Sequence, residues 1–409
     1  MSEADVSGEE AGADGLSIDA GLVRRLLASQ FPHWADLPLR RLHPAGSDNV
    51  IYRLGQDMSV RLPRGEWAAG QAAKEHAWLP RLAPHLPLPI PVPLGVGDPA
   101  FGYPWDWSVS RWLPGETATV EGLTDPQRTA RELAEFLTAL QHALPVESAT
   151  PNPHDDVTGV PMANRDYATR AAIAAVQGTF DVPAMTAVWE SALRAPAWDR
   201  APVWFHGDLH LGNLLVSGGQ LSAVIDFAGL GAGDPACDLV IAWNLLSPET
   251  RPLFRAALQV DDATWTRAQG WALTTGLNAY TCYAAINPLV AMNTRRQISQ
   301  VLIDHGCPDR RSAPTHHRPA SRPAELASAR GGWTAWWSVS PDGRSSRAGV
   351  PGPEDPAPAS ASESASKSGN WRRALAPGRG APGPGRGHGC HDQRCDPVGP
   401  PPAQQLIHD

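Results

Sequence analysis

The amino-acid sequence predicts an α+β protein with two lobes, a small antiparallel-sheet lobe followed by a larger helical lobe. Three observations support this prediction. Short β-type segments separated by turns fill the first part of the chain, helical patterns follow, and roughly the last hundred residues show almost no apolar periodicity. We therefore expect a flexible N-terminus at residues 1–16, a sheet lobe at 17–113, a helical lobe at 114–305 and a disordered tail at 306–409.

The sheet lobe is predicted to begin with an amphipathic helix. Ser17 precedes apolar residues at helical spacing, so it is the expected N-cap of a helix that ends before Pro32. A second helix is expected at residues 66–79, where Pro80 stops it. The segment LPLPIPVPLGVG must be extended, because prolines at alternate positions exclude a helix. Strands are expected at residues 39–42, 49–54, 58–62 and 107–113.

The helical lobe is predicted to follow Gly115. Asp125 and Pro126 begin a helix with its apolar side chains on one face. The sequence NLLVSGGQLSAVIDF predicts a hairpin of two strands around a Ser-Gly-Gly turn. Asp234 and Pro235 then begin a series of helices. Further helices are expected at residues 166–176, 183–193 and onward to 303, with a short strand at 203–205.

The composition excludes several classes of protein. Hydrophobic residues make up 42% of the chain, enough for a sizeable core, which excludes a wholly disordered protein. The net charge of -8 argues against a general nucleic-acid binder, and no apolar run is long enough to span a membrane. The five scattered cysteines predict no disulfide framework, and the first 15 residues lack a signal-peptide pattern. We therefore expect a cytoplasmic protein with no nucleic-acid, membrane or protein partner.

The tail differs in composition from the rest of the chain. Residues 304–409 hold 16 of the 41 prolines, whereas the preceding 303 residues carry 21 Lys and Arg against 32 Asp and Glu. A sequence rich in Pro, Gly and Ser buries too little apolar surface to offset its chain entropy, which predicts disorder. A shifted reading frame in a GC-rich gene would produce a similar composition and is the second explanation of the tail.

The most specific chemical pattern is HGDLHLGN at residues 206–213. Asp208 and Asn213 lie five residues apart in this loop, and Asp226 ends the neighbouring predicted strand. Phosphoryl transfer needs a carboxylate that orients or deprotonates the attacking hydroxyl, together with hard oxygen ligands for magnesium. The spacing is that of the protein-kinase catalytic loop and its metal-binding aspartate. Use of the three residues as turn caps alone is a weaker explanation, because all three positions fit jointly.

Together with AVIDFAGLGAGDPACDL, the sequence HGDLHLGNLL resembles the aminoglycoside phosphotransferase family of kinase-like enzymes. The resemblance implies a protein-kinase-like bilobal fold, with ATP or GTP as co-substrate and Mg²⁺ as cofactor. It implies that Asp208 is the catalytic base and that Asn213 and Asp226 bind the metal. His206 and Asp234 would support the catalytic loop. For Asp234, a role as N-cap of the following helix is equally compatible.

The resemblance extends over the first lobe and covers roughly residues 17–303. AGSDNVIYRLG resembles the hairpin that covers the nucleotide, and SVSRWLPGE resembles the strand between the lobes. The nucleotide-binding residues that it implies are Gly46, Ser47, Asn49, Arg61, Glu75, Arg111 and Trp112. The alternatives to nucleotide binding are an ordinary turn at Gly46 and a solvent-exposed helix face at Glu75.

One position departs from the family pattern. The family usually has lysine on the third strand, paired with the helix glutamate, whereas the strand MSVRLPR places Arg61 there. Arginine keeps the charge but binds as a planar fork rather than as a point charge.

The family implies transfer of the γ-phosphoryl group to a hydroxyl of a small molecule, and aminoglycosides, macrolides and hydroxylated metabolites are the candidate acceptors. Two other functions stay open. The replacement of lysine by Arg61 admits a catalytically impaired protein that binds nucleotide without turnover. His206, Asp208 and His210 form an H-x-D-x-H pattern that fits a metallohydrolase, although no further ligand-spaced group supports it.

Overall fold

The computed structural model describes residues 17–42, 48–146 and 161–306, all of which belong to one unit of the chain. The N-terminus expected at 1–16 and the tail expected after Gly306 lie outside the described residues. The lobe boundary expected after residue 113 stays a prediction.

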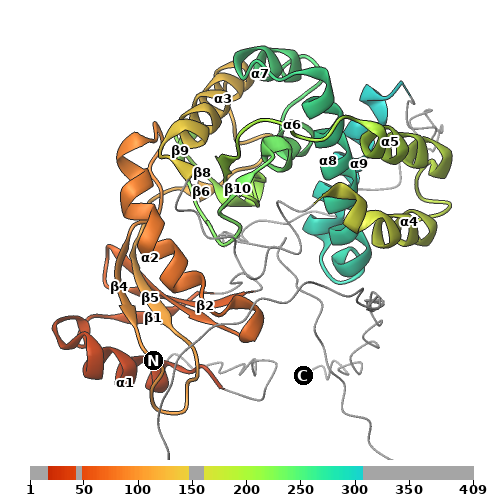
Figure 1. Ribbon diagram of the computed structural model, residues 1–409. Helices are drawn as coiled ribbons and strands as arrows, with labels where there is room; N and C mark the ends of the chain where they lie inside the picture. Colours follow the sequence, from red (N-terminus) through yellow and green to blue (C-terminus); the bar gives the residue numbers. More distant parts are fainter. Residues whose placement is uncertain (1–16, 43–47, 147–160, 307–409) are drawn as a thin grey trace, which may run out of the picture. The chain divides into compact units, whose positions relative to one another are not determined.

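A five-stranded antiparallel sheet forms the first part of the described chain (Figure 1). Its strand order is β1-β2-β3-β5-β4. The side chains of Val60 and Leu62 are fully buried on one face, so Arg61 between them points to the other face. The strands are β1 (Leu39–Arg41), β2 (Asn49–Leu54), β3 (Met58–Pro63), β4 (Pro93–Gly97) and β5 (Trp107–Arg111). Four of them lie where strands were expected, although β5 ends two residues earlier than predicted, and β4 forms in the segment expected to be extended.

Helix α1 (Ala20–Gln30) ends before Pro32, as expected, but its N-cap is Asp19 and not Ser17. The Asp19 carboxylate accepts the backbone N–H of Leu22 at 2.6 Å. The carbonyl of Ile18 instead accepts the buried hydroxyl of Tyr52 at 2.9 Å. The chain is therefore held to the sheet at Ile18, and the helix can begin only after that contact.

The helix expected at residues 66–79 is divided and shifted. A short 3-10 helix, Glu66–Ala68, is followed by α2 (Gln71–Leu82). Gly70 separates them with a φ of 81°, a left-handed conformation that glycine adopts without steric cost. Pro80 lies inside the last turn of α2 rather than ending it. A proline removes one intrahelical N–H bond, and near the C-terminal end little helix remains to be disrupted.

Helices make up most of the second part of the described chain, and α8 packs against α9 (Figure 1). They are α3 (Pro126–His142), α4 (Asp166–Ala175), α5 (Val182–Arg194), α6 (Ile241–Asn244), α7 (Arg251–Ala257), α8 (Asp262–Tyr283) and α9 (Pro288–Asp304). None of the helices in the described ranges is long and apolar enough to cross a membrane.

Two small sheets lie among these helices. Strands β8 (Leu214–Ser217) and β9 (Gln220–Val224) form the hairpin expected around the Ser-Gly-Gly turn, and β6 (Glu116–Thr117) extends it. The strand expected at 203–205 is β7 (Val203–Phe205). It pairs with β10 (Gly231–Gly233), whose Gly-Ala-Gly sequence carries no strand signal of its own.

Two apolar clusters form the core of the described residues. The smaller joins α1 to the inner face of the five-stranded sheet and includes Tyr52 and Trp107. The larger fills the helical part. It also takes in Trp78 and Leu79 from α2, so the C-terminal half of this helix packs with the helices that follow it in sequence.

A buried ion pair joins α7 to the end of α9. The side chain of Arg251 is 2% exposed and donates to Asp304 at 2.6 Å. Asp304 also accepts the indole N–H of Trp243 at 2.9 Å. Loss of the carboxylate would therefore leave both a buried charge and a buried N–H donor without this partner.

We expect Asp304→Ala to lower the free energy of unfolding by about 2–4 kcal/mol, measured by urea denaturation. Glu132→Ala is the matched control, because Glu132 pairs with Arg128 at the surface of α3, where the arginine is 49% exposed. That change should cost no more than about 0.5 kcal/mol. Equal losses in the two variants would contradict the structural role of the buried pair.

Candidate active site

The loop predicted to be catalytic, His206–Asn213 and called the catalytic loop below, connects β7 to β8, and side chains bind its backbone amides. The carboxylate of Asp238 accepts the N–H groups of His206 and Gly207 at 2.7 and 2.8 Å. Gly207 has a φ of 84°, and an added Cβ would lie 2.1 Å from the carbonyl oxygen of Gly229. The start of the loop thus needs glycine for its close approach to the neighbouring segment.

The loop support expected of Asp234 is supplied by Asp238 instead. Asp234 caps the 3-10 helix Pro235–Val240 and forms an ion pair with Arg267 at 2.6 Å. Asp238 is 1% exposed, and burial raises its pKa to about 7. A signal for this residue was available in the sequence, because a carboxylate within the apolar run PACDLVIAW must find hydrogen-bond donors when the run is buried.

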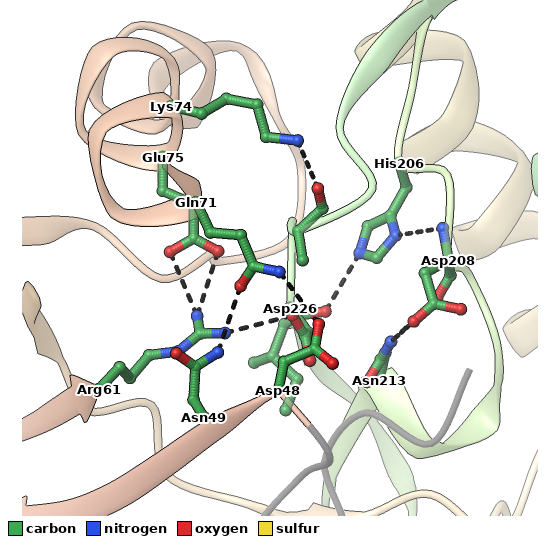
Figure 2. A network of polar contacts seen from close by, with 12 residues as sticks. Asp48, Asn49, Arg61, Gln71, Lys74, Glu75, His206, Asp208, Asn213 and Asp226 are labelled. Atoms are coloured by element: carbon green, nitrogen blue, oxygen red, sulfur yellow. Dashed lines mark hydrogen bonds and ion pairs between the residues drawn. The ribbon is translucent and has the colours of Figure 1, made fainter. Parts of the chain in front are cut away.

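The side chain of His206 links the catalytic loop to the segment that carries Asp226 (Figure 2). Its Nε2 donates to the carbonyl of Ile225 at 3.1 Å, and its Nδ1 accepts the backbone N–H of Asp208 at 3.2 Å. Burial lowers the pKa of His206 to about 4, so the imidazole is neutral at pH 7. Both ring nitrogens are therefore engaged within the protein.

Asp208 and Asn213 lie together at the two ends of the loop. The amide nitrogen of Asn213 donates to the backbone carbonyl of Asp208 at 2.9 Å and to its Oδ2 at 3.2 Å. Burial raises the pKa of Asp208 well above its ordinary value, and the nearby charges of Asp226 and Asp48 raise it further. Several carboxylates thus converge on one region, which favours a cation there.

Asp226 follows β9 in a conformation that few residues adopt. Its φ is 66°, in the left-handed region, which aspartate tolerates better than most side chains. The preceding N–H, that of Ile225, donates to the carbonyl of Asn213 at 2.9 Å. The catalytic loop therefore fixes the backbone immediately before Asp226.

Arg61 of β3 joins the sheet to both α2 and the Asp226 segment (Figure 2). Its Nη1 lies 3.2 Å from Oε1 and from Oε2 of Glu75, and its Nη2 lies 3.2 Å from Oδ1 of Asp226. Burial works to lower the pKa of Arg61, but the two carboxylates outweigh it and hold the pKa above its ordinary value. Arg61 is therefore a permanent cation at this point.

Helix α2 contributes a second set of polar contacts that the sequence did not indicate. Lys74 donates to the carbonyls of Ala228 and Leu230, just beyond Asp226. Gln71 donates to the carboxylate of Asp48 at 3.0 Å. The side-chain oxygen of Gln71 also accepts from Asn49 at 3.3 Å. The helix thus contacts both the segment at Asp48 and Asn49 and the segment after Asp226.

The other predicted nucleotide-binding residues lie apart from this network. Arg111 ends β5 and is exposed, and the Trp112 ring stacks 4.1 Å from the guanidinium of Arg53. The backbone N–H groups of Arg111 and Trp112 donate to protein carbonyls at 3.0 and 2.7 Å. Gly46 and Ser47 lie outside the described residues.

Asp226 and Asn213 fit a magnesium ion by the chemistry of their donors. Asn213 directs its NH₂ group toward Asp208, so its carbonyl oxygen is the atom able to coordinate a cation. Mg²⁺ in phosphoryl-transfer sites takes one or two protein oxygens and completes its shell with phosphates and water. In the described part of the chain, no group of three or more His, Cys, Asp or Glu could hold a metal ion by itself.

The chain is similar to known proteins both in sequence and in fold. Residues 40–271 match the family model APH, the phosphotransferase enzyme family. No curated protein sequence matches the chain significantly. The GDP and kanamycin complex of APH(2")-IIia is 22% identical with a TM-score of 0.50, covering 70% of this chain and 98% of that one.

A second similar structure is the GDP complex of wild-type aminoglycoside 2'-phosphotransferase-IIIa. It is 20% identical with a TM-score of 0.51, and the match covers 69% of this chain and 98% of that one. These likenesses confirm the kinase-like fold expected from the catalytic-loop motif. Because the family model matches more than half of the chain, the protein belongs to the APH phosphotransferase enzyme family.

Proposed function

We propose that the protein transfers the γ-phosphoryl group of ATP or GTP to a hydroxyl group of a small molecule. The observation that carries this proposal is the convergence of Asp208, Asn213 and Asp226 on one site, to which β3 brings the cation Arg61 (Figure 2). The GDP and kanamycin found in a structure of similar fold support a nucleotide and an aminoglycoside as the two substrates. Macrolides and other hydroxylated metabolites are further candidate acceptors.

Asp208 is the proposed catalytic base. Its raised pKa makes it a better proton acceptor than an ordinary aspartate. The hydrogen bond from Asn213 to its Oδ2 orients the carboxylate, with Oδ1 as the other oxygen that could receive the acceptor hydroxyl. In this arrangement the carboxylate directs the hydroxyl oxygen toward the phosphorus and takes its proton as the new P–O bond forms and the bond to the departing nucleoside diphosphate breaks.

Asn213, Asp226 and Arg61 are proposed to bind the phosphate side of the reaction. Asn213 and Asp226 would hold Mg²⁺, which neutralises charge on the phosphate oxygens. Arg61 supplies a fixed cation, and Glu75 holds its guanidinium in place with contacts to both carboxylate oxygens. A preorganised charge of this kind stabilises the transition state because it needs no reorientation during the reaction.

The geometry does not favour a metallohydrolase built on His206, Asp208 and His210. Both nitrogens of His206 are engaged by backbone groups, and Nδ1 of His210 accepts the N–H of Gly212 at 3.0 Å. Burial lowers the pKa of His210 well below its ordinary value. The histidines thus stabilise the loop, and the remaining alternative is a nucleotide-binding protein without turnover.

Asp208→Asn should reduce turnover by at least about 10²-fold and leave nucleotide affinity nearly unchanged, because the carboxylate acts on the acceptor and not on the nucleotide. Turnover is measured as nucleotide consumption over a panel of aminoglycosides, macrolides and hydroxylated metabolites. Asp199→Asn, at an exposed site before β7, is the control and should retain full activity. Nucleotide binding by the parent protein without turnover on any acceptor would favour the impaired alternative.

Asp226→Ala should abolish the increase in nucleotide affinity that Mg²⁺ produces, because the variant loses the charged metal ligand. The measurement is the nucleotide Kd by calorimetry with Mg²⁺ and with EDTA. Asp208→Asn serves as the comparison, and its Kd should keep the full magnesium dependence. If Mg²⁺ strengthens nucleotide binding equally in Asp226→Ala and in the parent protein, the metal assignment is wrong.

Arg61→Ala should lower kcat/KM by roughly 10²–10³-fold, the usual scale for loss of one preorganised charge-stabilising group. Arg61→Lys should keep measurable activity, because the positive charge survives. Arg40→Ala, at an exposed position of β1, is the matched control and should behave like the parent. Parent-like turnover in Arg61→Ala would show that another cation holds the phosphates.

A further inference from the structure

The backbone of the catalytic loop is also held at its centre, through a chain of buried amide side chains. The N–H of Leu211, midway between Asp208 and Asn213, donates to Oδ1 of Asn244 at 2.8 Å. The amide nitrogen of Asn244 donates to Oε1 of Gln297, also at 2.8 Å. Asn244 and Gln297 are 1% and 0% exposed, so water does not substitute for these bonds.

Gln297 is anchored in turn on α8. Its amide nitrogen donates to the carbonyl of Ala272 at 2.7 Å and to the hydroxyl of Thr275 at 3.1 Å. Gly276 allows α9 to pack closely against α8 here, because an added Cβ would lie 3.1 Å from Cγ1 of Ile298 and 3.2 Å from the Gln297 amide nitrogen. Glycine inside a helix makes that helix less stable than alanine would. At Gly276, close packing against Gln297 therefore outweighs helix propensity.

The residue before Gln297 secures Asn244 from its backbone side. The guanidinium of Arg296 donates to the carbonyls of Asn244 and of its neighbours Trp243 and Leu245. Two consecutive residues of α9 therefore bind Asn244. Gln297 binds its side-chain amide, and Arg296 binds its main-chain carbonyl. Helix α9 lies beyond residues 40–271, the part of the chain that matches the family model.

We propose that Asn244 and Gln297 are positioning residues of the phosphotransferase site, and that these two side chains, from α6 and α9, hold the centre of the catalytic loop in place. The inference rests on the proposed roles of Asp208 and Asn213. The 3-10 turn Leu211–Asn213 carries Asn213, and the Leu211 N–H fixes where that turn begins relative to Asp208. A displacement of about 1 Å between reacting groups can cost on the order of 10²-fold in rate.

Gln297→Met tests this inference, because it removes the amide while nearly keeping the side-chain volume. We expect kcat on a confirmed acceptor to fall at least about 10-fold, whereas nucleotide Kd changes less than about 3-fold. Hydrogen exchange at the Leu211 amide, followed by NMR or mass spectrometry on the full chain, should become at least about 10-fold faster. The exchange measurement needs no substrate.

Gln300→Met is the matched control on the same helix. Gln300 accepts from Arg251 at 2.8 Å, away from the catalytic loop, so its loss should affect stability without changing kcat or Leu211 exchange. If Gln297→Met does not fold, Gln297→Asn replaces it. Asparagine keeps an amide, but its side chain is one methylene shorter, so the amide no longer reaches Asn244. The same two measurements are then made on Gln297→Asn.

Leu211 exchange that is equal in the Gln297 and Gln300 variants overturns the inference, whatever the acceptor screen finds. Faster Leu211 exchange with unchanged kcat also overturns it, because the loop would then be held without consequence for turnover. If the parent protein turns over no acceptor at all, the proposed function fails, and faster Leu211 exchange in the Gln297 variant still supports the attachment of the loop to α9.

Discussion

The guanidinium of Arg61, a largely buried cation whose side chain is 13% exposed, joins three separate parts of this protein. Strand β3 buries Val60 and Leu62 on one face and thereby directs Arg61 to the other face. A buried charge is costly unless it is paired, so carboxylates from α2 and from the segment after β9 must approach it. Glu75 and Asp226 meet this requirement, each at 3.2 Å. The position of the Asp226 segment is thus tied to the sheet through one side chain.

The catalytic loop follows from a second constraint, the need of buried backbone amides for acceptors. Little of the loop is regular secondary structure, so side chains replace the missing backbone partners. Asp238 binds the first two N–H groups of the loop, His206 binds the next, and Asn244 binds that of Leu211. Such bonds fix the backbone on both sides of Asp208 without a ligand, and under the proposed function this is the preorganisation that positioning and electrostatic catalysis require.

The predictions that were correct in detail are those that depend on neighbouring residues in the chain. Apolar alternation and turn residues depend on neighbours in the chain, and the bounds of β2 and β7 were predicted correctly. The start of α2 was wrong because Gly70 interrupts a helical pattern that composition alone continues. The N-cap of α1 was wrong because Tyr52, more than thirty residues away, binds the carbonyl of Ile18.

The sequence by itself determined the candidate chemistry, because Asp208 and Asn213 share one loop and their spacing is a local property. Tertiary structure alone decided which groups support that chemistry. Asp238 rather than Asp234 binds the loop, and Gln297, more than eighty residues later, supports it through Asn244. Both are buried polar groups whose partners depend on which helices pack together. Nothing in the local sequence states that packing, since it is set by the apolar surfaces of several distant segments.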